Sequence, residues 1–326
     1  MEVGSRMSWV RKKVRTLNGR KYILKGIISL KYFMDCFSLP LSREHKALYF
    51  VIHQYMHEQL NRFPNLVSGD GLNDKIQWLK LFDQQALIIQ CSDKLQVRDY
   101  IISTIGVGFL PEIYQICDEF QDIDIEKLPD YFVMKSSHDS GSTLIVKDKS
   151  ELDKKSAEVF FTSSLKSVYG TDNGEWAYFF IRPRVFAEEL LGPRYETSPP
   201  ADYKFHCSNG KVLWHQLICD RGANAKEVIT DSTGEILSIH LNETFSFSNE
   251  FSKPEQWGDL INVAEKLSAP FKYVRVDLYL VKERVYVGEL TFFPWKGCHS
   301  GEGENFLGKM LVLDRSTPCN LYCENI

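Results

Sequence analysis

The sequence of 326 residues contains no apolar run long enough to cross a lipid bilayer. Its eight cysteines are scattered without a CxxC pair, so the chain lacks the ligand spacing of a zinc site. No secretory signal peptide opens it, and with free thiols we expect a cytoplasmic protein. The net charge of −4 offers no overall attraction to nucleic acid, so we expect no nucleic-acid partner.

The chain also lacks the motifs of covalent catalysis and of the common nucleotide-binding loops. No Ser–His–Asp or Cys–His arrangement is recognisable, and a loop rich in Ser is not a Walker A motif. No internal repeat or low-complexity tract is present. Any chemistry is therefore expected from charged side chains that strands and loops bring together.

What the sequence does have is an ordinary globular composition with an unusual beginning. It is 44% hydrophobic and 25% charged, and its length predicts more than one domain or lobe.

The first 31 residues carry nine Lys and Arg against one acidic residue, and residues 21–37 mix such charges with apolar side chains. Two interpretations remain open. One is a basic amphipathic helix in peripheral contact with the inner face of the cell membrane, and the other is a solvated helix that packs on the body.

The most informative stretch is residues 275–291, in which two runs of β-branched and aromatic residues flank the charged residues 282–284. This pattern predicts a β-hairpin with a three-residue loop, in which Val281 pairs with Val285. The loop length matters, because a two-residue loop would turn the later side chains to the opposite face of the sheet.

In this register Asp277 lies directly opposite Glu289 on one face, with Arg275 and Thr291 beside them. Two facing carboxylates repel each other. A hard cation between them would remove this cost, and Mg²⁺ takes oxygen ligands that it usually shares with substrate phosphates. The hairpin therefore predicts a Mg²⁺ site. The alternative is an exposed edge hairpin with solvated charges.

Other charged and small polar residues follow one another in an informative order. Lys94 opens a helix, Lys135 ends a buried strand, and the Ser-rich loop of residues 136–143 follows. A later strand ends in Glu188-Glu189, and another strand carries Asp202 and Lys204. Alone, each piece is more typical of an ordinary surface strand or loop.

Several segments together carry a resemblance to a known family. They are Leu72–Leu81, Asp93-Lys94 with Val97-Arg98, Leu128–Asp130, Lys135 with His138–Gly141, Ile145–Ser150, Asp202–Phe205, Arg275–Asp277 and Gly288–Phe292. In this order they resemble the ATP-grasp superfamily and, more closely, its TupA-like family of teichuronopeptide biosynthesis, over roughly residues 72–297.

Two positions depart from the family pattern. Thr291 stands where many ATP-grasp enzymes have Asn, so a hydroxyl replaces an amide. Asp139 stands in the Ser-rich loop where Gly is expected. An extra anion beside the phosphates of ATP should weaken binding unless it points away from them.

The resemblance implies an α+β fold of the ATP-grasp type, in which two α+β lobes hold ATP between antiparallel sheets. It implies an N-terminal lobe at residues 71–130, a lid at 131–191 and a C-terminal catalytic lobe at 192–326. The basic, helical residues 1–70 form an N-terminal extension outside the resemblance.

The activity that the resemblance implies is an ATP-dependent carboxylate–amine ligase, which phosphorylates a carboxylate and lets an amine displace the phosphate. The implied substrates are an amino acid and the uronic-acid carboxylate of a bacterial capsular or cell-surface glycan. The protein's part in such a reaction is mainly positioning and charge neutralisation, for which no enzyme nucleophile is needed.

The resemblance also assigns roles to individual residues. Lys94 and Lys135 would contact the ATP phosphates, and Ser140, Gly141 and Ser142 would close over them. Glu188, Glu189 and Leu190 would read adenine and ribose, and Asp202 and Lys204 would lie near the ribose and terminal phosphate. Asp277 and Glu289 would bind Mg²⁺, and Arg221 and Arg275 would stabilise the acylphosphate.

Two other functions fit the same scaffold. One is a phosphotransferase that phosphorylates a sugar hydroxyl and needs no amine. The other is a non-catalytic nucleotide- or glycan-binding module, for which Asp139 is the motive. Four aromatic residues are candidates for stacking on a sugar or ribose face, although core positions are the commoner use of such side chains. They are Trp176, Tyr178, Trp214 and Trp295.

Overall fold

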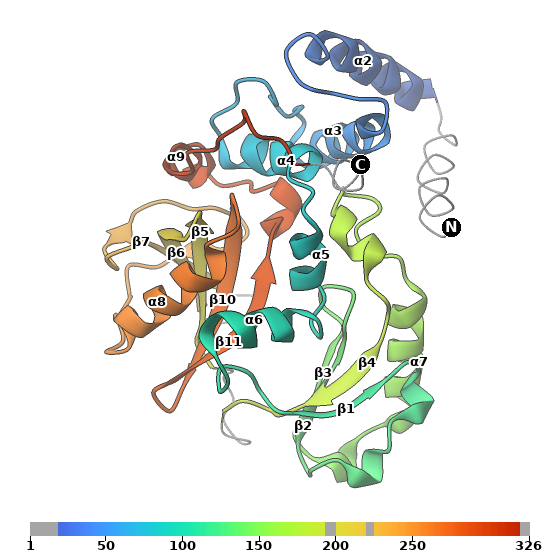
Figure 1. Cartoon of the computed structure of the whole chain (residues 1–326), viewed down its shortest axis with the longest axis vertical. Coiled ribbons are helices and arrows are strands. Elements are labelled where there is room, and N and C mark those ends of the chain that lie inside the picture. Colours follow the sequence, from blue (N-terminus) through green and yellow to red (C-terminus); the bar gives the residue numbers. More distant parts are fainter. Residues whose placement is uncertain (1–18, 193–199, 220–224, 320–326) are drawn as a thin grey trace.

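The computed structural model describes residues 19–192, 200–219 and 225–319 (Figure 1). A group of helices occupies one end of the molecule, and two separate β-sheets occupy the other. The predicted α+β class is confirmed. No helix within the described ranges is long and apolar enough to span a membrane.

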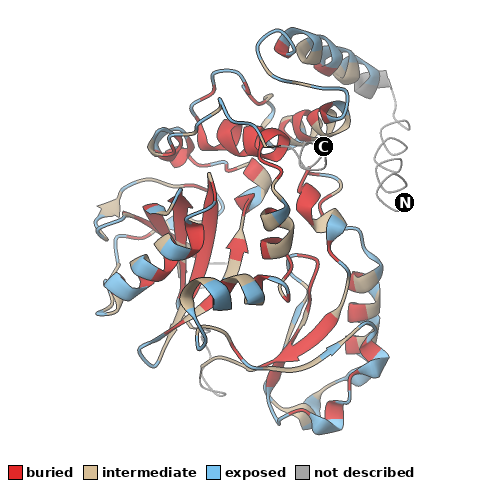
Figure 2. Ribbon diagram, viewed as in Figure 1, coloured by how far each residue is buried: buried red, intermediate tan, exposed pale blue. Residues whose placement is uncertain are grey.

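The helical end is organised around α4 (Leu72–Phe82), which is buried along its whole length (Figure 2). Its lysines tolerate burial because their ammonium groups donate to backbone carbonyls, as Lys75 does to Gly308 and Leu311, both at 2.9 Å. The helix therefore ties the C-terminal segment to the body. The other helices here are α2 (Gly19–Asp35), α3 (His45–Leu60), α5 (Ala86–Ser92), α6 (Val97–Ile105) and α9 (Gly303–Met310).

The smaller sheet has four strands in the order β1-β4-β2-β3 and a core of its own. Phe161 of α7 (Lys154–Lys166) packs there with Phe132 and Met134. The strand β1 lies before residue 130, so this sheet draws on both sides of the boundary predicted between N-terminal lobe and lid. The strands are β1 (Ile113–Cys117), β2 (Phe132–Ser136), β3 (Thr143–Val146) and β4 (Val185–Glu188).

The larger sheet has seven strands in the order β11-β10-β5-β6-β7-β8, with β9 paired to β7. The helix α8 (Trp257–Ser268) covers one face of it, and only the β7–β9 pair is parallel among its described strands. Asn209 and Gly210, which connect β5 to β6, both have positive φ, as a type I′ turn requires. The strands are β5 (Asp202–Ser208), β6 (Lys211–Cys219), β7 (Lys226–Asp231), β8 (Ile236–Leu237), β9 (Ser246–Phe247), β10 (Val274–Val281) and β11 (Arg284–Thr291).

The central hairpin of β10 and β11 confirms the predicted pairing of Asp277 with Glu289, but by a different route. The predicted three-residue loop is wrong: the loop has two residues, Lys282 and Glu283, both with positive φ. A β-bulge at Gly288 adds the residue that the loop lacks and restores the facing carboxylates. A Cβ at this glycine would lie 2.7 Å from the ring of Tyr279, so the bulge requires glycine.

Candidate active site

A cavity of about 500 Å³ lies between the two sheets, lined by residues of both and by α6. It brings together residues from distant parts of the chain, as the family pattern predicts. Among the candidate residues, Ser142 and Arg275 do not line the cavity, and Arg221 lies outside the described residues. The predicted residues that line it are Lys94, Lys135, Ser140, Gly141, Glu188, Glu189, Leu190, Asp202, Lys204, Asp277 and Glu289.

One wall of the cavity is the face of the large sheet that carries Asp277. Arg275 binds both of its carboxylate oxygens at 2.7 Å, and Lys204 donates to one of them at 2.7 Å and to Asp202 at 2.6 Å. Burial alone would raise the pKa of Asp277, but the charges of Arg275 and Lys204 lower it to about 2. The carboxylate is therefore ionised throughout the neutral pH range.

Glu289 faces Asp277 across the hairpin and is far more open, with 45% of its side chain exposed. Its Oε1 accepts from Thr291 Oγ1 at 3.0 Å and from Arg275 Nη2 at 3.3 Å. The guanidinium therefore offsets the repulsion between the two carboxylates without a metal ion. Thr291, which stands where many ATP-grasp enzymes have Asn, contributes to the site because its hydroxyl holds Glu289 in place.

The donor set fits Mg²⁺ of the kind that binds one or two carboxylates and completes its shell with phosphates and water. Glu289 has an exposed carboxylate for this. Oδ2 of Asp277 already accepts from Arg275 and Lys204, whereas Oδ1 accepts one hydrogen bond from Arg275 and keeps a lone pair for the ion. Within the described ranges, no three His, Cys, Asp or Glu side chains gather as a self-sufficient metal site. Any such ion would need oxygen ligands from a bound phosphate.

The opposite wall carries the two candidate phosphate-binding lysines. Lys135 bonds to Glu188 at 2.5 Å. Lys94 does not open a helix as predicted, because it lies in the turn between α5 and α6. Its ammonium donates to the carbonyls of Ser136 and Asp139, at the start of the Ser-rich loop. Burial lowers the pKa of Lys94, and the nearby carboxylate of Asp139 partly offsets this effect.

Asp139 points away from the cavity, into the small lobe. It is buried, and its Oδ2 accepts hydrogen bonds from the hydroxyls of Ser142 and, at 2.7 Å, Ser164 of α7. The anion therefore fixes the base of the loop, while Ser140 and Gly141 at its tip line the cavity. Ser142 directs its hydroxyl to Asp139, which accounts for its absence from the cavity wall.

The candidate adenine edge is where β4 leaves the small sheet. Glu188 is buried between Lys135 and Arg98, whose Nη1 lies 3.8 Å from Oε2. Glu189 pairs with Glu112 through its backbone N–H at 2.8 Å. Sequence reasoning missed Arg98 as a site residue. It lies next to Val97 in a matched segment, but its role depends on a partner 90 residues away in the chain.

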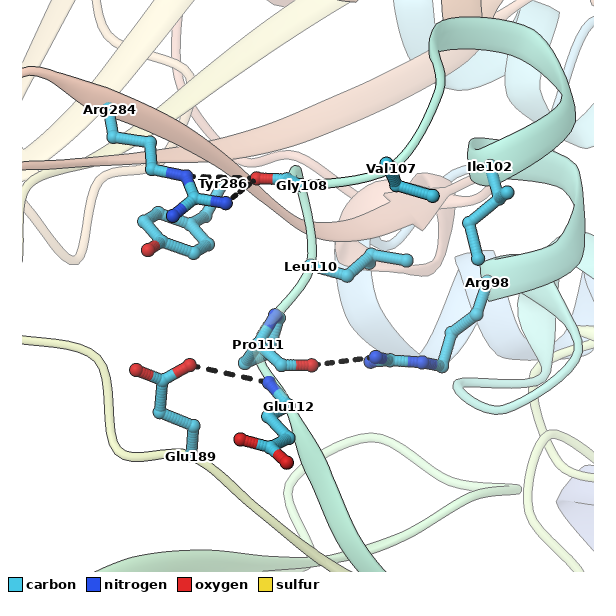
Figure 3. Close-up of a pocket in the computed structure, with 10 residues that line it drawn as sticks. All are labelled: Arg98, Ile102, Val107, Gly108, Leu110, Pro111, Glu112, Glu189, Arg284 and Tyr286. Atoms are coloured by element: carbon cyan, nitrogen blue, oxygen red, sulfur yellow. Dashed lines mark hydrogen bonds between the residues drawn. The ribbon is translucent and has the colours of Figure 1, made fainter.

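A smaller cavity of about 340 Å³ adjoins the first and shares Arg98 and Glu189 with it (Figure 3). Here two arginines hold the loop that connects α6 to β1. Arg98 donates to the carbonyl of Pro111 at 2.6 Å, and Arg284 donates twice to that of Gly108, at 3.0 and 2.6 Å. Figure 3 shows both guanidinium groups directed at this loop, which they anchor to the body.

The chain matches one family model, that of the TupA-like ATPgrasp family, over residues 74–312. The match contains every described candidate residue, and it also spans Arg221. It confirms the predicted family and the ATP-grasp fold. No curated protein matches the chain.

Solved structures with a similar arrangement are more distant. An L-amino acid ligase from Bacillus licheniformis is 14% identical, over 87% of this chain and 65% of its own, with a TM-score of 0.44. D-alanine–D-alanine ligase from Bacillus anthracis in complex with ATP is 17% identical, over 68% and 64%, with a TM-score of 0.38. The ATP-grasp ligase PsnB with its minimal precursor is 13% identical, over 73% and 67%, with a TM-score of 0.38. The chain spans less than two thirds of the length of the D-alanine–D-alanine ligase.

Proposed function

Because this chain belongs to the TupA-like ATP-grasp family, we propose that it is an ATP-dependent carboxylate–amine ligase with its reaction centre between the two sheets. One observation carries the proposal. Lysines on one wall of a single cavity face a carboxylate pair on the other, which is the charge pattern that a metal-bound polyphosphate requires.

In the proposed reaction a carboxylate oxygen of the first substrate attacks the γ-phosphorus of ATP, and the bond to ADP breaks. The amine nitrogen of the second substrate then attacks the acyl carbon, and phosphate leaves with the electron pair. Lys94 and Lys135 would hold the phosphates, and Ser140 and Gly141 would cover them. When bound, Mg²⁺ would neutralise phosphate charge from a position held by Asp277 and Glu289.

Arg275 has a positioning role in this scheme. Its guanidinium is buried and donates to both oxygens of Asp277 and to Glu289, so it orients the two carboxylates and adds positive charge beneath them. Glu188, Glu189 and Leu190 would read adenine and ribose with Asp202 nearby. Lys204, between Asp202 and Asp277, would move to the terminal phosphate when the nucleotide enters.

For the substrates we propose an amino acid as the amine and a uronic-acid carboxylate of a bacterial capsular or related glycan as the acid. A cytoplasmic enzyme would meet such a glycan while it is still attached to its lipid carrier. The choice of the acid rests on the family, because Arg275 and Lys204 are already paired with Asp277 and Asp202 and do not by themselves attract a further anion.

The direct test measures release of ADP and phosphate with ATP, Mg²⁺, a uronic-acid oligosaccharide and a pool of amino acids. We expect turnover only when both carboxylate and amine are present, a product heavier by an amino acid minus water, and at least a hundredfold loss in Glu289→Ala. Glu250→Ala, an exposed glutamate far from the hairpin in sequence, is the control. ADP release without an amine and without free phosphate would replace the ligase by a sugar kinase. Nucleotide binding without turnover in any mixture would leave a binding module.

We also propose that α2 holds the enzyme against an anionic membrane. Its outward face is apolar although it lies at the edge of the molecule (Figure 1), and Ile28 on the other face packs on the body. The basic residues of the first 31 positions favour an anionic partner over a second, equally basic copy. The apolar residues, each at least 48% exposed, are Tyr22, Ile23, Ile27, Leu30, Phe33, Met34 and Phe37.

Sedimentation with lipid vesicles tests the membrane proposal. We expect binding to vesicles containing phosphatidylglycerol, weaker binding to pure phosphatidylcholine, and loss of binding in Ile27→Ser with Phe33→Ser. Val312→Ser removes an apolar side chain that is equally exposed elsewhere and should change nothing. Concentration-dependent dimerisation through the same face, without vesicle binding, would contradict the proposal.

A further inference from the structure

The sequence offers four aromatic candidates for stacking on sugar, and burial separates them. Trp176 and Trp214 are 5% and 0% exposed and belong to the core. Trp295 is 42% exposed, whereas every other tryptophan in the described ranges is buried. Among the described tryptophans, the ring of Trp295 is therefore the one that a ligand can reach.

The backbone at Trp295 is held in a conformation that non-glycine residues rarely adopt. Trp295 and Lys296 have φ of 50° and 58°, in the left-handed region. Two buried side chains of α4 hold this turn, η5 (Pro294–Gly297). Lys80 Nζ donates to the Lys296 carbonyl at 2.7 Å, and Gln77 Nε2 donates to the carbonyls of Lys296 and Gly297 at 3.1 and 2.9 Å. Strain maintained in this way is typical of functional positions.

The indole ring is also held by its neighbours. The ring of Phe245 lies nearly perpendicular to it with ring centres 5.7 Å apart, and His299 lies tilted at 6.4 Å. Asn242, in the amide orientation that satisfies both of its polar groups, accepts from Nε1 at 3.2 Å. These contacts fix the ring, which is still partly open to solvent.

Strand register places this ring on the same side of the large sheet as the carboxylates. Asp277 pairs with Lys204 and Lys204 pairs with Gln216, so the three side chains share one face. On that face Gln216 donates to Glu227 at 2.5 Å, and Glu227 accepts from the backbone N–H of Leu241 at 2.7 Å. The segment after Leu241 therefore lies on that face beside β7, and Trp295 packs against it through Phe245 and Asn242.

We propose that Trp295 is a stacking platform for a sugar ring of the acceptor glycan, which deepens the proposed function and rests on it. Pyranose rings present C–H groups that pack on the electron-rich face of an indole, while their hydroxyls stay hydrated. A glycan whose uronic-acid carboxylate reaches the terminal phosphate of ATP in the cavity extends along the same face of the sheet. Trp295 binds a ring other than the one that reacts.

The test compares Trp295→Ala with the conservative Trp295→Phe and with Phe306→Ala, which removes another exposed aromatic ring. With a uronic-acid oligosaccharide as substrate, Trp295→Ala should raise the KM for the glycan about tenfold and leave the KM for ATP within twofold. Trp295→Phe should restore most of the affinity, and Phe306→Ala should behave as wild type. An equal rise of both KM values would mark a merely structural role and overturn the proposal.

Fluorescence tests the same site without turnover. In a Trp9→Phe background the described tryptophans other than Trp295 are buried, so added oligosaccharide should shift the emission and protect it from acrylamide. Absence of this shift while the glycan is converted to an amide would overturn the platform and leave the ligase standing. A shift with no amide formed from any amine would support the platform and overturn the ligase.

Discussion

Two pairs of lysines show how differently this chain uses one residue type. Lys75 and Lys80 of α4 are buried and donate to backbone carbonyls, which joins distant segments. Lys94 and Lys135 are partly buried too, but they line the cavity between the sheets, and each lies near a carboxylate. Lys94 also donates to backbone carbonyls, those of Ser136 and Asp139, so it is the open cavity that separates the two pairs. A phosphate that enters this cavity can reach the ammonium groups of Lys94 and Lys135.

The largest effect that separates the pairs is expected for Lys135→Met. The change removes a phosphate-binding charge and leaves Glu188 buried with Arg98 as its remaining cation. We expect kcat/KM for ATP to fall at least a hundredfold, with the melting temperature lowered by only a few degrees, about 1 kcal/mol. Steady-state kinetics and thermal unfolding measure the two effects. Lys155→Met, an exposed lysine of α7, is the control. Unchanged kinetics would remove Lys135 from the site.

Lys80→Met should show the reverse pattern. It removes the ammonium donor from the carbonyls of Asn173 and Lys296, and the second of these keeps Gln77 as a donor. We expect a loss of about 3 kcal/mol in the free energy of unfolding, measured in urea, and a smaller effect on the KM for ATP. Lys309→Met on the surface of α9 should cost almost nothing. A stable Lys80→Met protein with no ATP turnover would reverse the assignment of the two pairs.

Lys80 also predicts a dependence of stability on pH. Burial lowers its pKa from 10.5 to about 8, with Glu175 partly opposing the shift. Between these values the unfolded chain holds the proton that the folded protein has released, so the contribution of Lys80 to stability rises with pH. From pH 7 to pH 9 the difference in unfolding free energy between wild type and Lys80→Met should change by about 1 kcal/mol in favour of wild type. A difference that is flat with pH would mean that Lys80 keeps its ordinary pKa.

The smallest effect concerns the two arginines that anchor the loop between α6 and β1. Arg98 touches both this loop and Glu188, whereas Arg284 touches the loop and lies over the ring of Tyr286. Arg98→Ala should raise the KM for ATP about tenfold, and Arg284→Ala less than threefold, because only the first leaves the adenine edge with one cation fewer. Equal effects would assign the whole influence of Arg98 to the loop.

Much of the candidate site followed from the sequence because it depends on local pattern. Strand alternation places Asp277, Glu289 and Arg275 on one face, and the order of motifs predicts which segments meet. The family and fold were predicted in the same way. The roles of the individual residues, Arg221 among them, stay predictions.

What the sequence could not provide depends on contacts between distant segments. The two-residue loop of the hairpin and the bulge at Gly288 offset each other. The predicted pairing of Asp277 with Glu289 was therefore right, although the predicted loop length was wrong. Asp139 looked like an obstacle to phosphate binding because its partner Ser164 lies on a helix 25 residues away. The buried lysines of α4 resemble surface residues until their carbonyl acceptors are known.

The bulge at Gly288 sets the register of the hairpin between itself and the end of the strand. Deleting this residue alone shifts the register by one residue and turns Glu289 away from Asp277. Adding one residue at the tip between Lys282 and Glu283 restores the register. The double change has the three-residue loop that the sequence suggests, and the carboxylate pair survives in it. The facing carboxylates therefore depend on the loop and the bulge together, and not on either of them alone.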